Sequence, residues 1–167
     1  SVYKSFTMLY GYPVNDEFRV TADISVSNLS DTVASGGVEA IEGTGNEYSY
    51  SAGMIANSLL LKSDINILNL RISDLARSNA VVLSLSSKYR LNSHWRINPR
   101  IKYDTRDYND GREIDKFKPS IRLHYRKNKS WEFEFDFEYE TKSTKVPSQG
   151  TEDETSYILH AGYIYIF

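Results

Sequence analysis

Residues 131–141 read Trp-Glu-Phe-Glu-Phe-Asp-Phe-Glu-Tyr-Glu-Thr, an unbroken alternation of aromatic and acidic side chains. Successive side chains on a β-strand point to opposite faces, whereas a helix would spread these carboxylates around its whole circumference. The stretch therefore predicts a strand with an aromatic face and an acidic face. The aromatic face carries Trp131, Phe133, Phe135, Phe137 and Tyr139, and the acidic face carries Glu132, Glu134, Asp136, Glu138 and Glu140.

The preceding segment, residues 117–126, alternates apolar side chains with polar or basic ones. Turn residues at 128–130 separate the two segments, which predicts an antiparallel hairpin. The pairing that matches charges places Arg126 opposite Glu132, His124 opposite Glu134 and Arg122 opposite Asp136. It also places Tyr125, Leu123 and Ile121 opposite Phe133, Phe135 and Phe137. The hairpin then has one apolar surface and one charge-compensated surface.

The end of the chain carries a further alternating stretch. Residues 157–167 place Tyr157, Leu159, Ala161, Tyr163, Tyr165 and Phe167 on one face. This stretch resembles the C-terminal strand of bacterial outer-membrane β-barrels, which typically ends in Phe, with aromatic or apolar residues at every second position before it. The resemblance implies a location in the bacterial outer membrane, contact with its lipid, and recognition of the strand ending at Phe167 by the barrel-assembly machinery.

Composition is compatible with this class of protein. The chain has 167 residues, of which 40% are hydrophobic and 25% are charged, and its length predicts a single domain over residues 1–167. In a membrane barrel only every second strand residue faces lipid, so the mean hydropathy of −0.48 is permitted. No apolar run approaches the roughly 20 residues of a transmembrane helix. The 13 tyrosines suit interfacial aromatic belts, although a soluble β-sandwich also favours Tyr.

Several other functions find little support. The chain has no Cys, which excludes disulfides and thiolate metal sites, and its net charge of −2 gives no reason to expect nucleic acid. The glycines of residues 29–46 lack the Lys-Ser/Thr of a phosphate-binding loop, so we expect an exposed loop there. His124, His160 and Ser156 lack the spacing or partners of a metal site or hydrolase. We expect no catalytic residue, no metal site and no cofactor.

The alternating segments predict nine strands: 2–12, 17–28, 47–57, 65–73, 79–91, 95–105, 117–126, 131–141 and 157–167. The register of residues 59–73 stays open, because apolar side chains occur there on both faces. Connections are short at 13–16, 62–64, 92–94 and 128–130, and longer at 29–46, 74–78, 106–115 and 142–155. This alternation favours an outer-membrane barrel, which has short periplasmic turns and long outer loops.

The strand count leaves two architectures open, because single-chain bacterial barrels normally have an even number of strands. The fold is all-β: an antiparallel up-and-down transmembrane β-barrel of eight strands, or about nine strands contributed to a larger barrel. In the second case other chains or upstream segments complete the wall. The chain begins at Ser1 without an export signal, so either a signal has been removed or the chain is part of a longer protein.

The polar face is the candidate functional surface. In a wide barrel its charges line an aqueous channel, and in a narrow barrel they pair and plug the interior. The predicted lumen-lining residues are Arg96, Arg100, Lys102, Lys118, Arg122, His124, Arg126, Glu132, Glu134, Asp136, Glu138 and Glu140. The predicted lipid-facing girdle consists of Trp95, Tyr125, Trp131, Tyr139, Tyr163 and Phe167.

The leading functional prediction is a barrel that forms or completes a charged-lumen pore for solute passage or export. The alternative is a small closed barrel that acts as a membrane anchor or adhesion scaffold through the loops at 29–46, 106–115 and 142–155. A barrel enzyme with chemistry at the outer rim is a third hypothesis, and we expect the chain not to be an enzyme.

Overall fold

A computed structural model describes residues 3–31, 42–128 and 130–165. These residues form one sheet of nine antiparallel strands, in which each strand pairs with its neighbours in sequence. The strands are β1 (Tyr3–Pro13), β2 (Phe18–Leu29), β3 (Gly45–Asn57), β4 (Ile65–Leu75), β5 (Ser78–Arg90), β6 (Trp95–Tyr108), β7 (Glu113–Arg126), β8 (Trp131–Val146) and β9 (Gly150–Tyr165). The predicted all-β, up-and-down architecture is confirmed. Over the same residues, no helix has the length and apolar character needed to cross a membrane.

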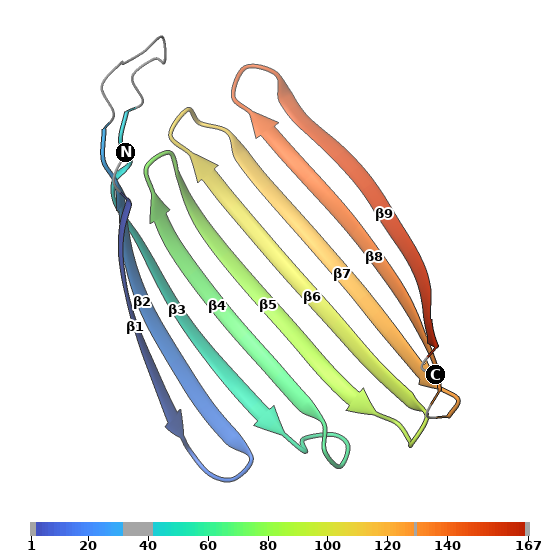
Figure 1. The fold of residues 1–167 in the computed structure, drawn as a ribbon. Helices are drawn as coiled ribbons and strands as arrows, with labels where there is room; N and C mark the ends of the chain where they lie inside the picture. Colours follow the sequence, from blue (N-terminus) through green and yellow to red (C-terminus); the bar gives the residue numbers. More distant parts are fainter. Residues whose placement is uncertain (1–2, 32–41, 129, 166–167) are drawn as a thin grey trace, which may run out of the picture.

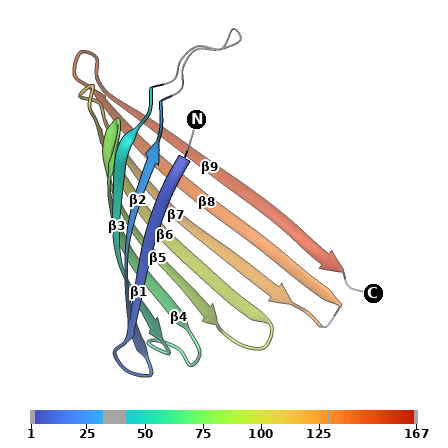
Figure 2. The same cartoon turned by 60° about the vertical axis from the view of Figure 1, so that its left-hand side comes forward.

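The sheet is a tilted, curled wall rather than a closed cylinder. Figure 1 shows the strands lying side by side from β1 to β9, and Figure 2 shows how strongly the sheet curls. Within the described residues, β1 and β9 each pair on one side only. They are therefore the two edges of the wall.

The two faces of the sheet differ in polarity along its whole width. Because Ile67 lies opposite Ser86, odd-numbered residues of β1–β4 share a face with even-numbered residues of β5–β9. This face is mostly polar. The opposite face is apolar, and Leu68, Leu70 and Ile72 of β4 belong to it. The register that the sequence left open at residues 59–73 is thereby assigned.

The apolar face has no covering layer. Among the described residues, the buried apolar ones are Ala56 and Ala80, whereas Phe133, Phe135 and Phe137 are 41%, 40% and 38% exposed. A soluble sandwich would bury these rings against a second sheet. A continuous exposed apolar face fits hydrocarbon instead, which excludes the sandwich alternative.

Three connections that were expected to be longer loops are largely strand. The turns occupy only residues 76–77, 109–112 and 147–149 of the segments 74–78, 106–115 and 142–155. The charged residues of these segments pair across the ladder: Lys145 Nζ lies 3.0 Å from a carboxylate oxygen of Glu113, and Lys142 Nζ lies 2.8 Å from one of Glu154. The predicted alternation of short and long connections was therefore wrong at these three positions. The remaining long connection, between β2 and β3, includes residues 32–41, which lie outside the described residues.

Three turns at the opposite end of the sheet share one design. In each, an Asn side-chain oxygen accepts hydrogen bonds from the backbone N–H groups two and three residues later, as in an Asx-turn. The donors are Glu17 and Phe18 for Asn15, His94 and Trp95 for Asn92, and Ser130 and Trp131 for Asn128. The third position is each time an aromatic residue that begins the next strand. The turn thus places a ring at the strand end.

The fourth turn at this end, residues 58–64, is built around a buried carboxylate. Asp64 is 1% exposed, and its two oxygens accept hydrogen bonds of 2.8–2.9 Å from the backbone N–H groups of Leu59, Leu60 and Leu61. Ser58 and Ser63 adopt positive φ, and the Ser58 hydroxyl accepts a bond from the Ser63 N–H. The predicted turn at 62–64 is thus the end of a longer one. The carboxylate replaces the missing backbone partners of three consecutive amides.

We expect Asp64→Ala to lower the urea unfolding midpoint in detergent micelles clearly, because three N–H groups lose their acceptor. Asp64→Asn retains one acceptor oxygen and should lie between Asp64→Ala and the natural sequence. Asp16→Ala, in another turn with an exposed side chain, is the control. Equal midpoints for Asp64→Ala and Asp16→Ala would contradict this role.

The same carboxylate predicts a direction of pH dependence. Burial alone would raise the pKa of Asp64, but the hydrogen bonds from Leu61, Leu60 and Leu59 outweigh it and hold the pKa below its ordinary value. A lowered folded-state pKa contributes stability that is present above the ordinary pKa, about 3.9, and is lost as the pH falls through the lowered value. The difference in midpoint between the natural sequence and Asp64→Ala should therefore shrink in strong acid. A difference that grew below pH ~4 would contradict the assignment.

Candidate functional site

The charged ladder of β7 and β8 has the predicted register. Arg126 lies opposite Glu132, His124 opposite Glu134, and Arg122 opposite Asp136, while Tyr125, Leu123 and Ile121 lie opposite Phe133, Phe135 and Phe137. Arg122 Nη2 lies 2.6 Å from Asp136 Oδ2, and Arg126 Nη2 lies 3.0 Å from Glu132 Oε2. A slip by one residue would set carboxylates against apolar side chains, so the alternation of the two strands excludes such a slip.

Each acidic side chain between 131 and 141 has a cationic neighbour. Arg122 Nε also lies 3.2 Å from Glu134, and Lys118 Nζ lies 2.7 Å from Glu138 and 3.5 Å from Glu140. Arg96 of β6 reaches across to within 4.0 Å of Glu132. Single exposed ion pairs contribute little, about 0–1 kcal/mol each, so the network matters mainly because it neutralises the acidic strand.

A second charged cluster on β6 was missed by sequence reasoning. Asp104 is 6% exposed and lies 3.2 Å from Lys102 Nζ and 3.1 Å from Arg106 Nε. The three residues occupy alternate positions of one strand and so share one face. The sequence signal was the spacing Lys-x-Asp-x-Arg at residues 102–106. It was missed because the expected loop at 106–115 placed Arg106 outside the strand that carries Lys102 and Asp104.

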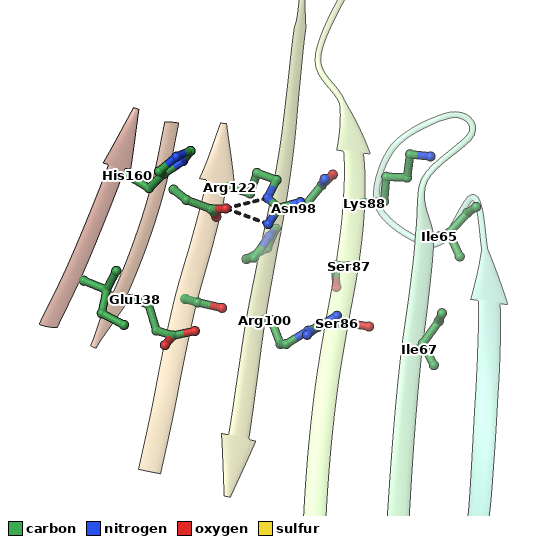
Figure 3. A pocket seen from close by; sticks show the side chains of 14 residues that line it. Ile65, Ile67, Ser86, Ser87, Lys88, Asn98, Arg100, Arg122, Glu138 and His160 are labelled. Atoms are coloured by element: carbon green, nitrogen blue, oxygen red, sulfur yellow. Dashed lines mark hydrogen bonds and ion pairs between the residues drawn. The ribbon is translucent and has the colours of Figure 1, made fainter. Parts of the chain in front are cut away.

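Two hollows lie on the polar face and meet at Arg100. One has a volume of 550 Å³ and is lined by residues of β4 through β9, including Ile65, Ile67, Lys88 and Arg100 (Figure 3). The other, of 480 Å³, is lined by β4–β6 and includes Arg71. Figure 3 shows the Arg100 side chain extending toward Ser86 of β5.

A third hollow, of 260 Å³, lies on the polar face at the end with the Asn turns. Its lining includes Arg90, Arg96, His124 and Glu132. Arg96 Nε and His124 Nδ1 are buried there without a hydrogen bond, although His124 Nδ1 lies 3.5 Å from Glu134. The described residues contain no group of three His, Asp or Glu side chains arranged to hold a metal ion.

The predicted girdle residues gather mostly at the end with the Asn turns. The ring centroids of Trp95 and Tyr125 lie 4.7 Å apart, and Trp131 lies 6.1 Å from Tyr163 and 4.6 Å from Tyr165. Tyr165 was not among the predicted girdle residues, although it belongs to the same alternating face. Tyr139 lies elsewhere, opposite Tyr157. Phe167 lies outside the described residues.

The fold is similar to that of a solved outer-membrane protein. The likeness is to "OmpT (in-vitro folded), an outer membrane protein of Vibrio cholerae", with a TM-score of 0.66 and 10% sequence identity, over 98% of this chain and 56% of that chain. The present chain thus spans little more than half of that protein's length. The likeness identifies an outer-membrane β-barrel fold and supports the predicted location in the bacterial outer membrane.

No curated protein sequence matches this chain. A family model does, and it carries the description "Putative MetA-pathway of phenol degradation". The match covers residues 12–167, from the last residues of β1 to the C-terminal Phe. Because it includes nearly the whole sheet, the chain belongs to this family.

Proposed function

We propose that the nine strands form part of the wall of an outer-membrane pore through which a small solute passes. The observation that carries the proposal is the two-faced sheet: an uncovered apolar face on one side, and on the other a polar face that lines hollows and carries most of the charges. In lipid the first face contacts hydrocarbon and the second contacts water.

The arrangement of the ion pairs favours an open lumen over a plug. Among the described residues, each ion pair on the polar face joins residues of one strand, of adjacent strands, or of β6 and β8. The charges that form these pairs are thus compensated along the wall, and none of the pairs reaches across the interior. Water can therefore occupy the space in front of the wall without leaving these carboxylates unpaired.

The edges of the sheet support a barrel with further strands. Since the nine strands are antiparallel, β1 and β9 run in the same direction, so pairing β1 with β9 would create a parallel seam. A second copy inserted in the same orientation would create the same seam twice. An antiparallel barrel instead requires an odd number of added strands. The present chain corresponds to 56% of the length of the similar protein. If its nine strands make up the same fraction of the barrel wall, the complete wall has about sixteen strands, an even number as in single-chain bacterial barrels.

The anchor or adhesion alternative has less support. Two of the three loops that would do this work, at 106–115 and 142–155, consist mainly of paired strands with short turns. The family description suggests a solute class instead, because it names phenol degradation. We take small aromatic compounds as the solutes, and Ile65, Ile67 and Ile158 offer apolar contacts beside the charges of the 550 Å³ hollow.

We expect the complete polypeptide that contains residues 1–167 to produce steady single-channel conductance in planar lipid bilayers. The physical reason is the hydrated, charge-lined face, which lowers the cost of moving ions across the membrane. A heat-denatured sample of the same preparation is the control. Silence from correctly folded protein would contradict the pore.

Closure of the barrel by added strands predicts which pairs of introduced cysteines form disulfides. Residues 1–167 contain no Cys of their own, so the introduced cysteines have no competing partner among them. Thr7→Cys with Ser25→Cys, which lie opposite each other on β1 and β2, should oxidise readily in the complete polypeptide. Thr7→Cys combined in turn with each polar-face position of β9 from Glu152 to Ile164 should give no disulfide. A bond within one molecule would indicate closure by β1 and β9, and a bond between two molecules would indicate a second copy. Either result would contradict closure by added strands.

A further inference from the structure

We infer that the polar faces of β4, β5 and β6 form an anion-accepting sector centred on Arg100, so that the pore prefers solutes carrying a carboxylate or another negative group. The inference rests on the proposed pore function and assigns its solute charge.

Charge is distributed unevenly over the polar face. On the described residues of β4–β6, the acidic side chain on this face is Asp104, whereas the basic ones are Arg71, Lys88, Arg90, Arg96, Arg100, Lys102 and Arg106. Lys102 and Arg106 pair with Asp104, and Arg96 pairs with Glu132. The remaining basic residues lie beyond ion-pair distance of every carboxylate in the described part of the chain.

The acidic strand does not offset this excess. Glu132, Glu134, Asp136, Glu138 and Glu140 of β8 already face Arg126, Arg122, Lys118 and Arg96. A solute cation would have to compete with these fixed partners. A solute anion meets guanidinium and ammonium groups whose hydrogen-bond donors are available.

Like charges also lie directly opposite each other at one end of this sector. Arg90 of β5 is the cross-strand partner of Arg96 of β6. Such pairs destabilise a sheet relative to neutral ones. A bound anion relieves the repulsion, so it stabilises the face that it occupies.

Arg100 has the central position in this sector. It lines both large hollows, with Lys88 in the first and Arg71 in the second, and Ser86 lines both as a hydroxyl donor. A guanidinium can bind a carboxylate through two parallel N–H groups, whereas the ammonium of Lys88 acts as a point charge. An anion can therefore pass from Lys88 to Arg100 and on to Arg71 without leaving the cationic surface.

The test measures the reversal potential of the complete polypeptide in planar bilayers under a KCl gradient. The natural sequence should show chloride preference. The double variant Arg71→Gln/Arg100→Gln should reduce the anion-to-cation permeability ratio by on the order of two-fold or more. Lys62→Gln/Lys127→Gln removes the same two positive charges from exposed turns and is the matched control. Circular dichroism establishes that each variant retains its strands.

Flux into proteoliposomes gives a second measurement with solutes of similar size. Benzoate should enter faster than benzylamine, and the double variant should narrow the difference. Current without anion preference, or a preference that the double variant leaves unchanged, would overturn this inference while the pore stands. The absence of any current would overturn both.

Discussion

The structure depends on the alternation of side-chain direction along a β-strand. In this sheet neither face is closed by a second layer, so the strands cannot be held by a protein core. What holds them is the backbone ladder, the contacts between neighbouring side chains on each face, and a solvent that suits each face. Lipid suits the face of Phe133, Phe135 and Phe137, while water suits the face of Arg122 and its carboxylate partners.

This dependence explains which registers the side chains exclude and which are left to the turns. On the apolar face, aromatic and aliphatic neighbours are interchangeable enough to tolerate a shift by two residues. On the polar face, Arg122 lies between Glu134 and Asp136, and Lys118 lies between Glu138 and Glu140. Because carboxylates occupy every second position from 132 to 140, these cations would also meet acids after a shift by two residues. The Asn turn selects among these alignments from the end of the hairpin, because Asn128 fixes where Trp131 begins the next strand. The charged side chains therefore neutralise the ladder, and the turn contributes to the register.

The sequence predicted the strands and the β7–β8 register because their alternation is strict, so that few alignments compete. It failed at 106–115 and 142–155 because charged residues and Gly are typical of loops, and only cross-strand partners such as Glu113 with Lys145 show them to be ladder. The role of Asp64 could not be predicted for a similar reason. Its three amide partners come from a turn whose geometry cannot be read from the sequence. Asp104 was missed because the expected loop hid Arg106 from its strand. Contacts within one alternating run were predictable, and those that needed the path of a turn were not.

The edges of the wall limit how the polar face can be used. In lipid, unpaired N–H and C=O groups along β1 and β9 would each cost several kcal/mol, so both edges require partner strands. In the proposed barrel these partners attach at β1 and β9, so they adjoin the two ends of the sheet and not its middle. The basic residues Arg71, Lys88 and Arg100 lie on the central strands, so added strands could reach them only across the lumen. In a barrel of about sixteen strands the interior is an aqueous channel too wide for side chains to fill. In the proposed pore, a charge at the centre of this wall therefore faces solute and water.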